Sequence, residues 1–141
     1  MRYVCDVPGG KTWFRLETEA EAEAESLAMH HAVEKYFVRE MEKAAHSYRP
    51  ASKTFVEQEI GLKAHILREM PLFLTLRDSG GTPLITAMLP PGGKADTAFR
   101  MIVVGPDNGD PYPEHGPAIE ALGRHFGMAL DRSRCFPYQR Q

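Results

Sequence analysis

No proline or glycine interrupts the chain from Glu19 to Tyr48, a stretch that we expect to form one helix. A helix of this length would span roughly 45 Å at about 1.5 Å per residue. A compact domain of 141 residues has a radius of gyration of only about 14 Å. One end of such a helix must therefore project, bend or pack against another copy. Apolar residues recur along the stretch with the spacing of one helical face: Met29, Val33, Tyr36, Phe37, Met41, Ala44 and Tyr48.

The start of this predicted long helix is marked by a capping box. Thr18 is followed three residues later by Glu21, which is the pattern that satisfies the first free backbone N–H groups. Glutamates alternate with other residues over Glu17–Glu25, and like charges four residues apart repel by a few tenths of a kcal/mol. We expect this acidic end to be the projecting, solvated part. An acidic contact for a basic partner is the alternative.

A second helix is predicted over residues 54–70. Thr54 and Glu57 repeat the capping pattern, and Pro71 disfavours helical geometry at the residue before it. Gly61 weakens the prediction by about 1 kcal/mol relative to alanine. A strand over Phe55–Leu62 is the alternative.

Short apolar runs separated by glycine and proline predict the strands. The first two form a hairpin, and the last three form an antiparallel meander. The expected strands are Tyr3–Val7, Thr12–Glu17, Leu72–Arg77, Pro83–Leu89 and Thr97–Val104. Met101–Val104 is continuously apolar, which is typical of a strand covered on both faces. A last helix is expected to begin near Pro117, since proline is favoured in a first helical turn.

These elements predict a single α+β domain over residues 1–141. The expected order is β-hairpin, long helix, second helix, three-strand meander and C-terminal helix. The five strands would form an antiparallel sheet with the helices on one face, giving two layers. This order resembles that of PAS-like and longin- or roadblock-like domains, whose sheets run 2-1-5-4-3. The resemblance is one of topology, and a function taken from it would be an analogy of fold.

The segment Gly105–Pro117 holds the candidate binding residues. It contains four prolines and three glycines, so we expect a loop rather than a helix or central strand. Loops on a rigid scaffold often carry function. The carboxylates and the histidine could bind a cation or do acid–base chemistry, and the start of the following helix could hold an anion. The alternative is that Pro, Asp, Asn and Gly occur here because tight turns favour them. The candidate binding residues are Asp107, Asp110, Tyr112, Glu114 and His115.

Other motifs do not support a catalytic or metal site. Gly10-Lys11-Thr12 resembles the end of a phosphate-binding loop, but Cys5 stands where that pattern needs a glycine. Adjacent His30 and His31 would point about 100° apart on a helix, so we expect one at the core edge and one in solvent. The sequence has no C-x-x-C pair and no G-x-S-x-G motif. We therefore expect no catalytic residue, metal or cofactor.

Composition limits the partners and the compartment. The net charge of −2 opposes nucleic-acid binding, even with the basic tail Arg132–Arg140. No apolar run approaches the roughly 20 residues of a membrane span, and the first residues lack the apolar segment of a signal peptide. We expect a cytoplasmic protein in which Cys5 and Cys135 are buried or half-buried thiols.

The sequence favours a non-enzymatic binding or protein-interaction domain. The over-long helix and its stripe of aromatic and Met side chains indicate a homodimer. A further protein partner or small ligand is compatible with this interpretation, but a nucleic-acid or membrane partner is not expected. The alternative is a small-ligand sensor or enzyme that uses the 105–117 loop.

Overall fold

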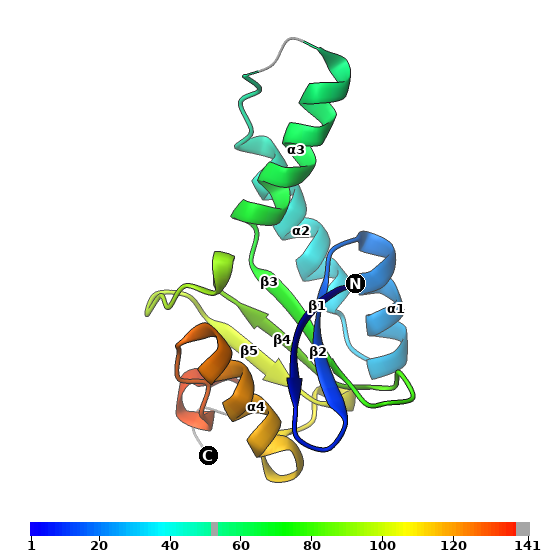
Figure 1. Ribbon diagram of the computed structural model, residues 1–141, viewed down its shortest axis with the longest axis vertical. Coiled ribbons are helices and arrows are strands. Elements are labelled where there is room, and N and C mark those ends of the chain that lie inside the picture. Colours follow the sequence, from blue (N-terminus) through cyan, green and yellow to red (C-terminus); the bar gives the residue numbers. More distant parts are fainter. Residues whose placement is uncertain (52–53, 138–141) are drawn as a thin grey trace.

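The computed structural model describes residues 1–51 and 54–137 and shows a sheet covered by helices, with a helical arm projecting from one end (Figure 1). The sheet order is β1-β2-β3-β4-β5-β6. The strands are β1 Arg2–Val7, β2 Lys11–Leu16, β3 Leu72–Arg77, β4 Pro83–Leu89, β5 Met101–Val104 and β6 Cys135–Phe136. The α-helices are α1 Glu19–Met29, α2 Val33–His46, α3 Phe55–Glu69 and α4 Tyr112–Phe126, and the 3-10 turns are η1 Pro91–Gly93, η2 Pro106–Asn108 and η3 Arg132–Arg134.

The first five strands form an antiparallel meander, which confirms the hairpin and the three-strand unit. The prediction of five strands was wrong, because β6 pairs in parallel with β5. This short strand supplies hydrogen-bonding groups to what would otherwise be a free sheet edge. The resemblance to PAS-like and longin-like domains does not extend to the sheet. Here β2 pairs with β3, whereas an order of 2-1-5-4-3 would pair the first and fifth strands.

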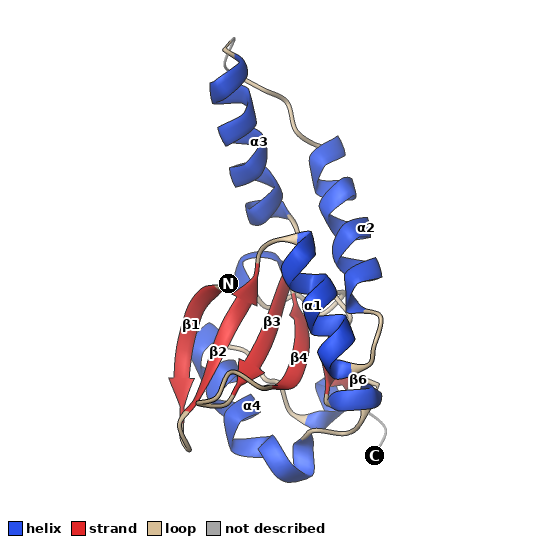
Figure 2. Ribbon diagram, turned by 90° about the vertical axis from the view of Figure 1, so that its right-hand side faces the viewer, coloured by secondary structure: helices blue, strands red, loops and turns tan. Residues whose placement is uncertain are grey.

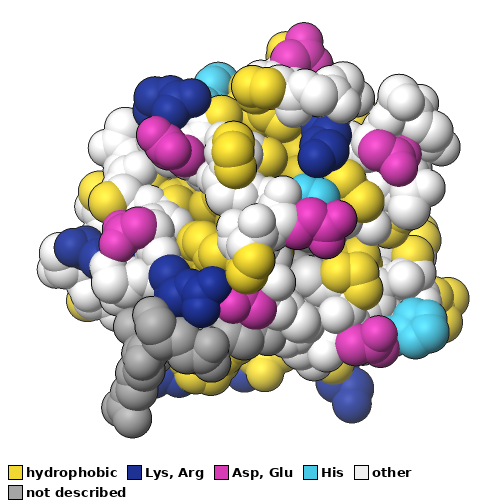
Figure 3. All heavy atoms as spheres, turned by 90° about the horizontal axis from the view of Figure 1, so that it is seen from below, with side chains coloured by type: hydrophobic (Ala, Val, Ile, Leu, Met, Phe, Trp, Pro, Cys, Tyr) yellow, Lys and Arg dark blue, Asp and Glu magenta, His cyan; other side chains and the backbone are white. Residues whose placement is uncertain are grey.

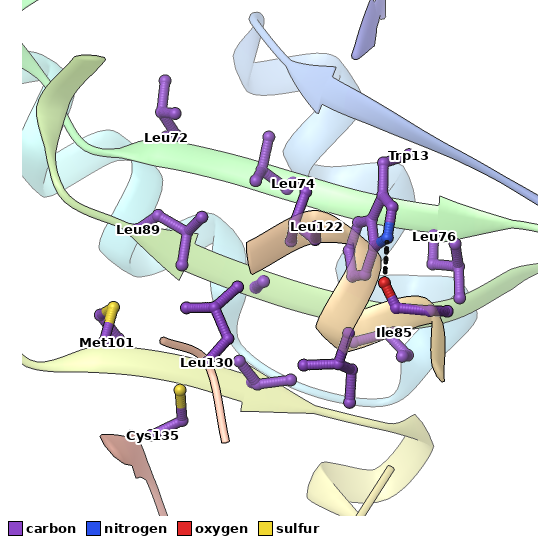
Figure 4. Close-up of a cluster of buried hydrophobic side chains, with 14 of the residues drawn as sticks. Trp13, Leu72, Leu74, Leu76, Ile85, Leu89, Met101, Leu122, Leu130 and Cys135 are labelled. Atoms are coloured by element: carbon purple, nitrogen blue, oxygen red, sulfur yellow. Dashed lines mark hydrogen bonds between the residues drawn. The ribbon is translucent and has the colours of Figure 1, made fainter. Parts of the chain in front are cut away.

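Helices cover both faces of the sheet, so the two-layer prediction was wrong (Figure 2). On one face the strands pack against α4, and the buried indole N–H of Trp13 donates to the carbonyl of Ala118 at 3.0 Å (Figure 4). On the other face, Leu16 and Phe73 pack against α1 and α2. The reason lies in β3, whose residues Leu72–Leu76 are all buried and therefore need cover on both sides.

The predicted long helix is broken at His30. This residue adopts a left-handed conformation with φ of 56° and ends α1. The N-cap residue of α2, Ala32, has no side chain that can accept a hydrogen bond. Instead, the Glu34 N–H in the first turn of α2 donates to Ser26 Oγ of α1 at 3.0 Å. The Val33 N–H points to His31 Nδ1 at 3.4 Å. The Ser26 and His31 side chains therefore stabilise the break, and the spacing of apolar residues in the sequence does not predict these contacts.

The acidic end does not project. The capping box of Thr18 and Glu21 is present, as predicted. However, α1 lies on the sheet, and the Glu25 side chain is 0% exposed. The part that projects is the arm formed by α2 and α3, which lie side by side in both views (Figures 1 and 2).

The arm is rooted on the sheet, and its second half is a helix rather than the alternative strand. Phe37 of α2 packs edge-to-face on Phe73 with ring centroids 5.2 Å apart. Arg15 Nη2 donates to the Leu67 carbonyl near the end of α3 at 2.6 Å. Gly61 has a packing role, because a Cβ there would lie 2.2 Å from the Tyr48 hydroxyl.

The last helix begins at Tyr112, five residues earlier than predicted. Asp110 Oδ1 accepts from the Tyr112 N–H at 3.0 Å, which supports the new start. The helix is distorted at His115 (φ −122°, ψ 22°), so Pro117 still begins the regular part. The expectation of loop throughout 105–117 was therefore wrong, because prolines are tolerated in a first helical turn.

The thiols and the chain end complete the fold. Both cysteines are free, Cys5 half-buried and Cys135 buried, as expected. No helix within residues 1–51 and 54–137 is long and apolar enough to cross a membrane. Tyr138 and Arg140, at the end of the basic tail, lie outside the described residues.

Candidate functional site

The structure does not gather the five predicted binding residues into one site. Asp107 lies beside the end of α1, where its carboxylate is 3.5 Å from His30 Nδ1. Asp110 and Tyr112 contact the segment after α4, His115 lies next to the hairpin residue Lys11, and Glu114 lies beside His115. The left-handed turn at Asp107 and the early start of α4 send these side chains in different directions.

Asp110 and Tyr112 anchor the segment that follows α4. Asp110 Oδ2 pairs with Arg132 Nη2 at 2.6 Å, and the Arg132 guanidinium lies 5.5 Å from the centre of the Tyr112 ring. The Tyr112 hydroxyl donates to the Leu130 carbonyl at 2.9 Å, and burial raises the pKa of that phenol. These contacts tie residues 130–132 to the start of α4.

An open groove of about 840 Å³ runs between α4 and residues 127–132. Gly123, Met128 and Leu130 contribute to its wall. The lower end of the molecule, seen in Figure 3, shows apolar surface divided by charged side chains of both signs. Neither the groove nor this face offers the single-sign surface that a strongly charged ligand would require.

His115 and Glu114 differ in environment. The His115 imidazole is buried, and Lys11 Nζ lies 3.4 Å from its Nδ1. Burial and the neighbouring Lys11 charge lower the pKa of His115, so the ring is neutral and accepts from the ammonium. Glu114 is 84% exposed, with its carboxylate 3.9 Å from the ring. Of the two predicted binding residues, His115 is engaged in a lysine–histidine contact beside the hairpin turn, whereas Glu114 lies in solvent.

A buried hydrogen-bond network that the sequence analysis did not predict lies on the other face of the sheet. Arg77 Nη2 donates to Glu25 Oε1 at 2.8 Å. The Thr86 hydroxyl donates to Glu25 Oε2 at 2.5 Å, and His31 Nε2 lies 2.9 Å from the same hydroxyl. Glu25 and Thr86 are 61 residues apart, so no local motif connects them.

The hydrogen bonds of this network determine which ring nitrogen of His31 carries the proton. The Thr86 hydroxyl uses its proton on the Glu25 carboxylate, so it must accept from His31 Nε2–H. Nδ1 is then the acceptor that faces the Val33 N–H. Burial lowers the pKa of His31, in keeping with a neutral ring. The expectation of one histidine at the core edge and one in solvent is confirmed, because the His30 side chain is 71% exposed.

A cavity of about 160 Å³ opens beside His31 and Thr86. Its walls come from the α1–α2 connection, the start of α2 and the facing strands, and Asn108 lies at its edge. The non-glycine residues with positive φ in residues 1–51 and 54–137 are His30, Asp107 and Asn108, and all three lie here. Left-handed non-glycine residues are costly and tend to cluster at functional sites.

Helix α3 of the arm leaves three apolar side chains in solvent. Phe55, Val56 and Ile60 of α3 are 73%, 64% and 66% exposed. A hollow of about 300 Å³ separates the end of α2 from the start of α3, lined by Tyr48, Pro50, Phe55, Gln58, Glu59 and Leu62. No three His, Cys, Asp or Glu side chains in the described part of the chain are arranged to hold a metal ion.

No protein-family model, curated protein sequence or solved structure matches this chain.

Proposed function

We propose that this protein is a non-enzymatic interaction domain that works as a homodimer, with the α2–α3 arm as the contact between two copies. One observation carries the proposal. Helix α3 is 15 residues long and has no buried residue, although it presents Phe55, Val56 and Ile60 to solvent. A helix of this length is marginal on propensity alone and depends on packing of an apolar face. A second copy would supply that packing.

The sequence of α3 suits pairing with itself. Val56, Ile60 and Ala64 follow one another at intervals of four and are all exposed, so they form one stripe along the helix. If two α3 helices run antiparallel about a two-fold axis at Ile60, Val56 of one copy faces Ala64 of the other. The same axis places Glu57 opposite Lys63. Apolar groups and opposite charges therefore meet in one register, as an isologous interface requires.

The charge and size of the arm also favour a second copy. Exposed or half-buried residues of both signs alternate on α2, including Glu34, Lys35, Arg39 and Glu40. A nucleic acid or an anionic membrane surface would favour one sign of charge. Two helices of about 22 Å, each about 10 Å across, give a face of roughly 440 Å² in projection. Side chains roughen such a face, so its accessible area exceeds this projection, which is itself about half of the ~800 Å² per partner of a standard interface.

The predicted loop residues support a non-enzymatic function. Asp110, Tyr112 and His115 are each held by a contact that fixes one segment of the fold to another. None of these contacts pairs an acid with a base across an open cavity, which acid–base catalysis would need.

Light scattering from low to high micromolar protein tests the proposal. We expect a concentration-dependent dimer for the native chain. Ile60→Glu should raise the dimer dissociation constant roughly 100-fold or more, because two isoleucines each lose about 1.5–3 kcal/mol of burial. Leu27→Glu is the matched control, since Leu27 is 73% exposed but lies on α1. A native chain that stays monomeric at high micromolar concentration would refute the proposal.

A cross-linking experiment tests the register. Residues on a two-fold axis face their own copies, so Ile60→Cys in a Cys5→Ser background should link efficiently through a short bis-maleimide. Leu27→Cys in the same background should link poorly. Equal linking at both positions would rule out an interface centred on Ile60.

A further inference from the structure

The cavity beside His31 has a defined shape and chemistry. Tyr36, Phe73 and Met88 contribute aromatic and thioether surface, while Ile102 and Val104 of β5 add aliphatic surface. The polar groups of His31 and Thr86 belong to the same lining. A cavity of about 160 Å³ is close in size to an engineered apolar cavity of about 150 Å³ that accepts benzene.

The cavity carries no ionised lining group. Among residues 1–51 and 54–137, no lysine, arginine, aspartate or glutamate lines it. The nearest buried charge is Glu25, which lies behind the Thr86 hydroxyl and is paired with Arg77. At the edge, His30 and Asp107 are 71% and 77% exposed and face each other. A charged ligand would lose its hydration without a buried counter-charge, so the cavity favours a neutral molecule.

The His31–Thr86 pair offers one hydrogen-bond acceptor to the cavity. The Thr86 hydroxyl donates to Glu25 and accepts from His31, which leaves one lone pair. His31 Nδ1 faces the Val33 N–H at 3.4 Å, longer than an ordinary N–H···acceptor bond. Because Nδ1 already accepts from the Val33 N–H, a ligand that offers one O–H or N–H donor has the remaining Thr86 lone pair as its acceptor. Aromatic rings suit the remaining walls, because thioethers and aromatic edges pack well against ring faces.

We propose that this cavity is a binding site for a small neutral aromatic molecule of one or two rings carrying a single O–H or N–H donor, the class of phenol and indole. The donor bonds to the Thr86 hydroxyl oxygen, and the ring lies among Tyr36, Phe73 and Met88. The left-handed residues His30, Asp107 and Asn108 lie in the α1–α2 connection and η2, the segments that border the cavity. The proposal does not depend on dimer formation, so an Ile60→Glu monomer should bind equally well.

Methyl NMR with ¹³C-labelled methionine tests the site. We expect phenol and indole to shift the Met88 methyl signal saturably, with a dissociation constant on the order of 1 mM, as few ligand atoms allow. The methyls of Met101 and Met128 are internal controls, since neither residue lines the cavity. Benzoate and benzylammonium should leave Met88 unchanged. No Met88 shift with either neutral probe, or an equal shift with benzoate, would overturn the proposal.

Two variants separate shape from hydrogen bonding. Ile102→Trp should fill the cavity and abolish the Met88 response, and retained methyl dispersion would show that the protein is folded. If Ile102→Trp fails to fold, Thr86→Val carries the test. It should weaken phenol binding roughly 5-fold or more, in line with about 1 kcal/mol for a lost hydrogen bond. Benzene binding should stay unchanged. Equal phenol and benzene binding in the native chain would exclude the hydrogen-bonding role of Thr86 and His31.

Discussion

Glu25→Gln should destabilise this protein strongly, although the substitution changes one atom. Glu25 is 0% exposed, and its partner Arg77 is 17% exposed. The glutamine amide keeps an oxygen that can accept from Thr86, so the main loss is the carboxylate charge facing Arg77. The arginine then remains largely buried without a counter-charge.

The expected loss of unfolding free energy is about 3–5 kcal/mol, which is typical when one partner of a buried ion pair is removed. A Coulomb estimate agrees, because two charges at about 4 Å with an effective dielectric of about 20 interact by about 4 kcal/mol. For a chain of 141 residues, an unfolding entropy of about 2.1 cal/mol/K per residue gives about 0.3 kcal/mol/K. The melting temperature should therefore fall by about 10–17 °C.

Urea unfolding and thermal scans with Glu120→Gln as control measure this effect. Glu120 pairs with Arg124 at 3.0 Å, but both side chains are mostly exposed. The control should lose less than about 0.5 kcal/mol. Glu25→Ala should cost about 1 kcal/mol more than Glu25→Gln, because the Thr86 hydroxyl also loses its acceptor. A Glu25→Gln loss no larger than that of the control would refute the idea that burial makes this pair important.

Two further predictions concern α4 and pH. Gly123→Ala should lower stability by about 1–3 kcal/mol in urea unfolding, because the new Cβ would lie 2.6 Å from the Met128 backbone carbonyl oxygen. Gly116→Ala, with nothing within 4 Å, should be neutral or stabilising by up to about 1 kcal/mol, and equal losses would contradict the packing argument. Burial lowers the folded-state pKa of His31, so the unfolded chain binds this proton more readily and stability falls as pH drops below about 6.5. When unfolding free energy is measured between pH 7 and 5, His31→Gln should make its dependence on pH less steep. Part of the pH dependence should remain, because the pKa of His115 is also lowered. An unchanged pH dependence would exclude His31 as a contributor.

Local patterns predicted the elements that depend on local physics. The Thr18–Glu21 capping box begins α1 as expected, and the hairpin and meander strands follow their turns. Thr54 caps α3, which decides between helix and strand for residues 55–69. In each case the favourable contacts lie within a few residues of one another, so the sequence alone contains them.

The candidate site could be predicted only in part. Asp107 was identified as a candidate residue, and it lies at the edge of the cavity beside His30. The hydrogen-bond network behind the cavity joins Glu25 of α1, Arg77 of β3 and Thr86 of β4. No spacing in the chain connects these residues, because the sheet register decides which of them meet.

By itself, the sequence determined the mixed α+β class, the strand turns and the side-chain caps of α1 and α3. Tertiary structure decided where the 19–48 stretch breaks and what projects. His30 adopts a left-handed conformation because Ser26 and His31 supply acceptors to the start of α2, while His31 is held by Thr86 on the sheet. Helical periodicity reports only contacts within a helix, whereas this break depends on a hydrogen bond between residues 55 positions apart.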